Sequence, residues 1–179
     1  SRTLAEKSLM MAHTADAVIA NSVIASKIVT TSGQLVVQDS SIASQKFTAT
    51  ESSRSELIGK SIIQSTDPAE IRGKIETTTT VTDRGIDNIP SIISTNEVLI
   101  SDNAVISGDS LTLEAGTLQN FGDIYLSGRL SARGGLFSNH GSASASEVFL
   151  GFDNAVFNFG SLSGNDVIIH SNLFNIAGG

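Results

Sequence analysis

Three Asn-x-Gly triplets recur at a fixed spacing of 19 residues in the C-terminal half of the chain. Each triplet begins with an asparagine and ends two residues later with a glycine: Asn120 and Gly122, Asn139 and Gly141, and Asn158 and Gly160. A single Asn-x-Gly is common, but three in one register indicate a repeated structural unit. Apolar residues keep the same register before and after each triplet, at Leu118, Phe137, Val156, Ile124, Ala143 and Leu162.

The N-terminal half carries a looser form of this pattern, with serine at the turn. Residues 17–27 (AVIANSVIASK) match residues 35–45 (LVVQDSSIASQ) at an offset of 18. Aligning all copies predicts a first apolar column at Val18, Val36, Leu57, Leu99, Leu118, Phe137 and Val156. A turn column follows at Ser22, Ser40, Ser61, Asn103, Gly122, Gly141 and Gly160. A second apolar column then runs through Ile24, Ile42, Ile63, Val105, Ile124, Ala143 and Leu162.

A period near 20 residues, built from short segments rich in Val, Ile, Leu, Thr and Ser between turn residues, predicts stacked strands. The L-x-x-L-x-L signature and the helical half of a leucine-rich repeat are both missing. We therefore expect an all-β parallel β-helix with about 19–21 residues per coil, six or seven coils and a length of about 30 Å. The apolar columns would become interior ladders, in which each buried Ile, Leu, Val or Phe contributes about 1.5–3 kcal/mol.

The Asn-x-Gly corners have a structural and a functional interpretation. In the structural one, the asparagine amides hydrogen-bond along a stack and the glycines supply positive φ at a corner. In the functional one, the corners form a ligand site. The strict register of the triplets favours the structural ladder.

Residues 64–97 interrupt the repeat and contain both prolines. Either one degenerate coil lies here, or the chain leaves the stack and returns. Strand-prone sequence on both sides of the turn at Asp83–Gly85 favours a β-hairpin that projects from the rod. Such excursions often carry binding sites, although this one could instead cover an apolar flank. Its charged candidates for contact with a partner are Arg72, Lys74, Asp83 and Arg84.

We expect one domain, in which residues 17–63 and 98–179 form the N-terminal and C-terminal coils. Residues 1–16 are a candidate capping segment, because Thr3-Leu-Ala-Glu6 is a capping box that would open a short helix through Met11. A further strand over residues 8–12 is the alternative. The chain starts without methionine and stops within the repeat, so we expect it to be part of a longer protein.

Composition argues against several functional classes. With 18 acidic and 11 basic residues the net charge is −7, which disfavours nucleic acid as a partner. The chain has no cysteine, and its histidines (His13, His140 and His170) lack metal-ligand spacing. No window is apolar enough to span a membrane. We expect no catalytic residue, no metal ligand and no cofactor, since the carboxylates that a glycosidase or lyase would need are dispersed, at Asp102, Asp109, Asp123, Asp153 and Asp166.

The C-terminal half resembles the haemagglutinin-type repeats of two-partner-secreted exoproteins of Gram-negative bacteria. The resemblance rests on LTLEAGTLQNFGDIYLSGRL, LSARGGLFSNHGSASASEVFL and VFNFGSLSGNDVIIHSNLFN, which share an L-x-L-x-A-G-x-L-x-N-x-G pattern and a period near 20. This group includes filamentous haemagglutinins, haemolysin-like exoproteins and contact-dependent inhibition toxins. The match is good over residues 99–179, looser over residues 17–65 and absent over residues 64–97.

The resemblance implies a right-handed parallel β-helix in a secreted or cell-surface filament that mediates adhesion or cell contact. The implied partners are a receptor or glycan on a host or neighbouring cell and, for the full-length chain, an outer-membrane secretion partner. It transfers no active-site residue, so we expect no enzyme. A purely structural spacer in a toxin-delivery filament and a carbohydrate-active β-helix are the alternatives.

Overall fold

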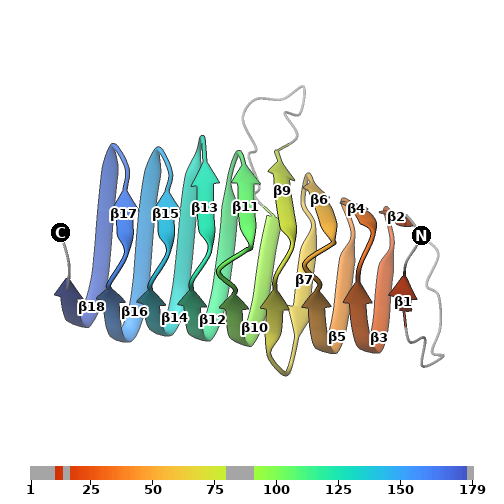
Figure 1. Ribbon diagram of the computed structural model, residues 1–179, viewed down its shortest axis with the longest axis horizontal. Helices are drawn as coiled ribbons and strands as arrows, with labels where there is room; N and C mark the ends of the chain where they lie inside the picture. The colour runs from red at the N-terminus through yellow and green to blue at the C-terminus, as the bar shows by residue number, and fades with distance from the viewer. Residues whose placement is uncertain (1–10, 14–16, 80–90, 177–179) are drawn as a thin grey trace.

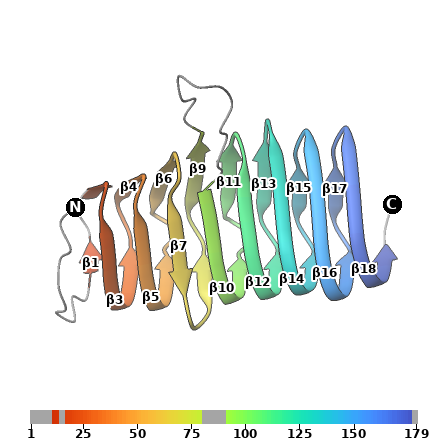
Figure 2. The ribbon, with the colours of Figure 1, turned by 180° about the vertical axis from the view of Figure 1, so that it is seen from behind.

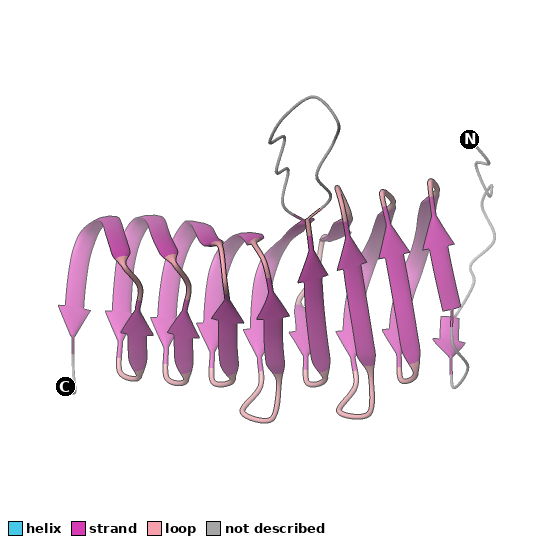
Figure 3. Ribbon diagram, turned by 90° about the horizontal axis from the view of Figure 1, so that it is seen from above, coloured by secondary structure: helices cyan, strands magenta, loops and turns pink. Residues whose placement is uncertain are grey.

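The computed structural model describes residues 11–13, 17–79 and 91–176, and every regular element within these ranges is a β-strand. The strands form two parallel sheets that stack as a β-solenoid along the long axis of a rod, with the first and last described strands, β1 (Met11–His13) and β18 (Asp166–Ile176), at opposite ends of the rod (Figure 1). The coils wind in the right-handed sense (Figure 3). The eight strands of the smaller sheet mark eight coils in the described ranges, slightly more than the sequence indicated.

Each coil contributes to both sheets, called sheet A and sheet B below. Sheet A contains β1 (Met11–His13), β3 (Val23–Thr31), β5 (Ser41–Ala49), β7 (Ile62–Ser65), β8 (Ala69–Ile71), β10 (Ser91–Ile100), β12 (Leu111–Asn120), β14 (Arg129–Asn139), β16 (Glu147–Asn158) and β18 (Asp166–Ile176). Sheet B contains β2 (Ala17–Ala20), β4 (Gln34–Gln38), β6 (Arg54–Ile58), β9 (Lys74–Thr78), β11 (Val105–Gly108), β13 (Asp123–Leu126), β15 (Ser142–Ser144) and β17 (Ser161–Ser163). Figure 2 shows the strands of sheet A side by side on the reverse of the rod.

The interior is filled by ladders of side chains that occupy the same position in successive coils. One ladder of sheet A consists of Ile24, Ile42, Ile63, Ile93, Leu113, Ala132, Leu150 and Ile169. One ladder of sheet B consists of Ala17, Leu35, Ser55, Ile75, Ile106, Ile124, Ala143 and Leu162. In both ladders the inner members are buried and only the end members are partly exposed. Parallel stacking therefore places most of the apolar repeat inside the rod. The first apolar column is wrong at Val18 and Val36, which face outward, Val18 being 72% exposed.

The columns aligned from the sequence need a correction, because each combines two different sides of the coil. The N-terminal members of the second apolar column lie in sheet A: Ile24, Ile42 and Ile63. The C-terminal members lie in sheet B: Ile124, Ala143 and Leu162. The serine turns therefore lead from sheet B into sheet A, whereas the Asn-x-Gly turns lead from sheet A into sheet B. Short apolar segments on either side of a turn look alike in both places.

Three alignments are also wrong by one residue. Leu57 pairs with Val37 rather than Val36. Leu99 pairs with Gln119 rather than Leu118, and Val105 pairs with Asp123 rather than Ile124. Successive residues of a strand point to opposite faces, so a slip of one residue exchanges an inward for an outward position. In each case two adjacent apolar residues compete for one inward position: Val36 and Val37, Val98 and Leu99, and Val105 and Ile106.

The excursion expected over residues 64–97 also needs correction, because most of this segment is a regular coil. Strands β8 and β9 pair in register with the coils before and after them. Thr78 is the partner of Ile58, and Ile92 is the partner of Ile62, so thirteen residues connect Thr78 to Ile92 where three connect Ile58 to Ile62. The double-length step in the sequence is thus one ordinary coil plus a longer corner, and the proposed hairpin turn at Asp83–Gly85 lies outside the described residues.

At the N-terminal end, Met11–His13 form strand β1, which pairs with β3. The short helix expected from Thr3 through Met11 therefore does not include Met11, and the remainder of that prediction falls outside the described residues. The alternative prediction, a strand over residues 8–12, is confirmed for residues 11 and 12, which belong to β1.

The asparagines of the Asn-x-Gly triplets stack inside the corner between sheet A and sheet B. The Nδ2 of Asn120 donates to the Oδ1 of Asn139 at 2.8 Å, and the Nδ2 of Asn139 donates to the Oδ1 of Asn158 at 2.7 Å. Each Nδ2 also donates to a backbone carbonyl, of Ser142 at 3.1 Å and of Ser161 at 2.9 Å. All three side chains are buried, and each amide satisfies the next one along the rod.

The glycines of the triplets are required for close approach rather than for positive φ. Among the described residues, the glycines with φ in the left-handed region are Gly59, Gly108 and Gly134, so the positive φ expected at the triplets is wrong. A Cβ at Gly141 would overlap the carbonyl oxygen of Gly122, and a Cβ at Gly160 would overlap that of Gly141. The same carbonyls accept hydrogen bonds from Ser142 and Ser161 in the following coil, so they cannot move away.

We predict that Asn139→Leu lowers the free energy of unfolding by about 2–4 kcal/mol, because it leaves buried amide and carbonyl groups without partners. Asn120→Leu is the matched control: it breaks one ladder bond but also removes an Oδ1 that has no partner. We expect the smaller loss for Asn120→Leu in urea denaturation followed by circular dichroism. Equal losses for the two variants would contradict the claim that the hydrogen bonds of the asparagine ladder contribute to the free energy of unfolding.

We also predict that Gly141→Ala destabilises the rod by about 1–3 kcal/mol, because the added methyl must displace backbone of the preceding coil. The control is Gly151→Ala, where the Cβ meets side chains and no backbone, namely the ring of Phe149 at 3.1 Å and the Cγ of Arg133 at 3.8 Å, so its effect should be close to zero. Thermal melting should separate the two variants by about 2–4 °C per kcal/mol in a chain of this size. Indistinguishable melting temperatures would show that the corner can relax.

Candidate functional site

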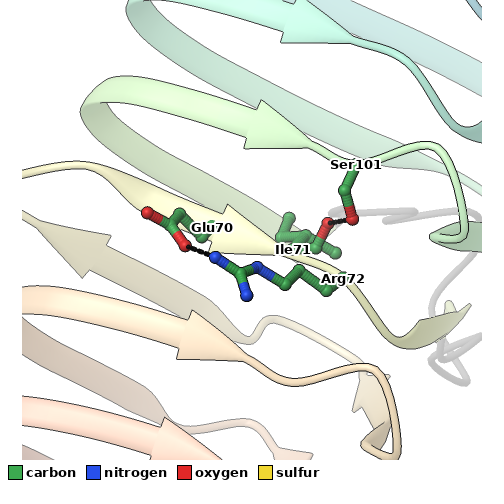
Figure 4. A network of polar contacts seen from close by, with 4 residues as sticks. All are labelled: Glu70, Ile71, Arg72 and Ser101. Atoms are coloured by element: carbon green, nitrogen blue, oxygen red, sulfur yellow. Dashed lines mark hydrogen bonds and ion pairs between the residues drawn. The ribbon is translucent and has the colours of Figure 1, made fainter.

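The charged residues proposed for partner contact do not form one cluster in the described part of the chain. Arg72 directly follows β8, where its Nη2 lies 2.7 Å from the Oε2 of Glu70 (Figure 4). The hydroxyl of Ser101 donates to the carbonyl of Ile71 at 3.2 Å and ties this segment to the next coil (Figure 4). Lys74 begins β9, an ordinary rung of sheet B. The other two candidates, Asp83 and Arg84, lie outside the described residues.

The dispersed acidic residues are turn and surface residues where the structure describes them. Asp109 is the most engaged, since its carboxylate accepts hydrogen bonds from the backbone N and the hydroxyl of Thr79, both at 3.1 Å. This contact holds the start of the long corner after β9 against the next coil. Within the described ranges, no group of three or more His, Asp or Glu side chains is arranged to hold a metal ion.

An aromatic ridge lies on the outside of the Asn-x-Gly corner. The ring of His140 stacks between Phe121 and Phe159, with centroid distances of 4.7 and 4.9 Å and interplanar angles of 7° and 20°. These distances match the spacing of neighbouring strands, so each coil contributes one ring. The ring faces cover one another and the edges point outward. The ridge is therefore an outer counterpart of the buried asparagine ladder.

We predict that His140→Ala lowers the free energy of unfolding by about 1 kcal/mol, because it removes two stacked contacts. His140→Phe keeps both stacked contacts and loses only the exposed 2.9 Å hydrogen bond between the His140 Nε2 and the Ser138 Oγ, so its stability should stay close to that of the native chain. Chemical denaturation of the two variants beside the native chain provides the measurement. If the alanine variant unfolds at the same denaturant concentration as the native chain, the ridge does not contribute to stability and its exposed rings need another explanation.

A shallow hollow lies on the outer face of sheet A, over β12, β14 and β16. It has a volume of about 440 Å³, and hydroxyl-bearing residues form its floor while longer side chains form its walls. The floor includes Thr112 and Ser131, and the walls include Arg129, Arg133 and Glu147. Ser131 faces outward yet is only 9% exposed, because these longer side chains rise around it. We call this site the β14 hollow.

A second hollow, of about 760 Å³, adjoins the first and shares Arg133 with it. It extends over β16 and β18, and its lining includes Phe149, Asp153, His170 and Asn172. The guanidinium of Arg133 lies 5.6 Å from the centre of the Phe149 ring, and the ring of His170 is tilted against Phe149 at 5.7 Å. We call this site the β16 hollow.

Sequence reasoning missed both hollows, although it considered His170 and Asp153 individually. Their residues occupy outward positions between inward ones, as Arg129, Ser131 and Arg133 alternate with Leu130 and Ala132. These outward residues do not repeat from coil to coil, as Arg129, Glu147 and Asp166 at one position show, so the period gives no signal for them. Once the inward register is known, however, the alternation alone identifies which side chains share this face.

Comparison with known proteins finds no family model, no curated protein and no solved structure that matches this chain. A search of the described residues for a helix able to cross a membrane finds none.

Proposed function

We propose that this chain is a non-catalytic β-helical segment of a large bacterial exoprotein, secreted or held at the cell surface, that acts in adhesion or cell contact. The observation that carries the proposal is the use of the repeated residues. The asparagine of each triplet bonds the asparagine of the next coil, and the glycine leaves room for a neighbouring backbone. The repeated residues thus make the contacts that hold the rod together. This supports the role of a scaffold that presents its outer side chains to a partner.

The outer face of sheet A is the surface with which such a rod would make contact. The β14 and β16 hollows combine guanidinium, hydroxyl, amide and aromatic groups over neighbouring strands. A shape of this kind suits a receptor segment or a glycan better than a small buried substrate. The proposed partners are therefore a receptor or glycan on another cell and, for a longer parent chain, an outer-membrane secretion partner.

A carbohydrate-cleaving enzyme is the second candidate, because the hollows could hold sugar. Hydrolysis needs two carboxylates, one as general acid and one as base or nucleophile. Glu147 is the carboxylate of the β14 hollow, and its Oε2 lies 2.6 Å from the Nη2 of Arg129. The β16 hollow contributes Asp153. An ion-paired glutamate in one hollow and an aspartate in the other favour binding over cleavage.

We predict that the purified chain binds host or bacterial cells saturably and releases no sugar from a glycan array. A variant with residues 79–90 replaced by Gly-Lys, the two residues that precede Ser61 at the equivalent corner, should keep this binding. Circular dichroism must first show that the variant retains its β structure. Loss of binding in the variant would assign the contact to residues 79–90. Absence of binding by the native chain would contradict the contact function and favour the alternative of a purely structural spacer.

A further inference from the structure

Arg133 differs from the other arginines around it in having no carboxylate partner. Among the described residues, ion pairs join Arg72 to Glu70 and Arg129 to Glu147, whereas Arg133 forms none. Glu114 is its in-register neighbour on β12, yet the two side chains are not within ion-pair distance. The guanidinium is exposed and rests near the ring of Phe149. Its planar set of donors is therefore open to an outside group.

The position of Arg133 gives that open guanidinium two neighbouring surfaces. On one side lies the floor of the β14 hollow, with the hydroxyls of Thr112 and Ser131. On the other side lies the β16 hollow, which is lined by Phe149, by the carboxylate of Asp153 and by His170. A ligand that spans both hollows must pass Arg133, so the charge lies at the middle of a polar track.

The local charge of the β14 hollow is opposite to that of the whole chain. Two arginines and one glutamate line it, which gives a net charge of +1, whereas the chain as a whole carries −7. The β16 hollow shares Arg133 and adds Asp153, so the charged side chains of the two hollows, Arg129, Arg133, Glu147 and Asp153, sum to zero. On an acidic rod, the β14 hollow beside Arg133 is therefore the part of the two hollows that favours an anionic group. The hydroxyl-bearing floor suits a ligand that is itself rich in hydroxyl groups.

We propose that the paired hollows bind an acidic saccharide, with the sugar carboxylate at Arg133. A guanidinium forms two parallel hydrogen bonds with a carboxylate, and such charge-assisted pairs are stronger than neutral ones. The hydroxyls of Thr112 and Ser131 hydrogen-bond the acidic sugar, and Phe149 with its neighbours contacts the adjoining sugar. This inference rests on the proposed contact function and names the chemistry of its ligand.

Titration calorimetry with trigalacturonate, and with the neutral galactose trisaccharide as comparison, tests the proposal on the full chain. We expect trigalacturonate to bind at least about tenfold more tightly than the neutral sugar, with an affinity that falls as salt rises. Arg133→Gln should lower the affinity for trigalacturonate about tenfold or more, which is the range expected for the loss of a hydrogen bond to a charged group. Arg72→Gln, on an ion-paired arginine outside both hollows, should change nothing.

A second variant separates shape from charge. Ser131→Val fills the floor of the β14 hollow without changing its charge. It should also lower the affinity for trigalacturonate, while the variant keeps its β structure. Failure of the native chain to bind trigalacturonate, equal affinity for the neutral sugar, or full binding by Arg133→Gln would each overturn the proposal.

The cell-binding assay run with the same variants separates this inference from the contact function. If Arg133→Gln keeps both native cell binding and full trigalacturonate binding, the saccharide site is overturned and the contact function stands. Trigalacturonate binding that depends on Arg133, in a chain that binds no cell, would support the site and contradict the contact function.

Discussion

Parallel stacking in register is the constraint on which the rest of this structure depends. Each inward side chain contacts the equivalent side chains of the coils above and below it. A residue type is therefore stable at an inward position only if it packs on, or hydrogen-bonds to, its equivalents in the neighbouring coils. Apolar residues satisfy this condition simply, because Ile can pack on Ile. A buried polar residue satisfies it only if its neighbour can return the hydrogen bond. Asn139 does so in both directions, whereas the Oδ1 of Asn120 faces a coil with Ile100 in its position and has no partner.

The two halves of the rod meet this constraint at different corners. In the N-terminal half, Ser40, Ser61 and Ser91 are buried where sheet B turns into sheet A, and their hydroxyls donate to backbone carbonyls. In the C-terminal half the buried polar stack moves to the corner between sheet A and sheet B and is made of asparagine. Serine is too short to reach the next serine and bonds the backbone instead, while asparagine bonds its own kind. The change occurs around the long corner that follows β9, which separates the two stacks.

This change explains how much could be predicted from the sequence. The fold class and the register of the last three coils were predictable, because Asn120, Asn139 and Asn158 mark a unique position in each coil. The offset of 18 that pairs Val18 with Val36 and Ile24 with Ile42 was also predictable. The register of Leu57 and Leu99 was not, because Val36 and Val37, or Val98 and Leu99, offer two equally apolar choices for one inward position. The regular coil at β8 and β9 escaped detection because its inward residues include Thr77 and because the corner after it is long.

The candidate site could not be predicted for a different reason, which also bears on how such a rod acquires a function. Backbone hydrogen bonds and inward side chains supply most of the energy that holds coil to coil, so an outward residue such as Arg133 or Phe149 can change without disturbing a ladder. A site then forms wherever small outward residues, here Thr112 and Ser131, lie between larger ones on neighbouring strands. Repetition specifies the scaffold and departures from repetition specify the surface, so the binding chemistry of this chain must be sought in the residues that do not repeat.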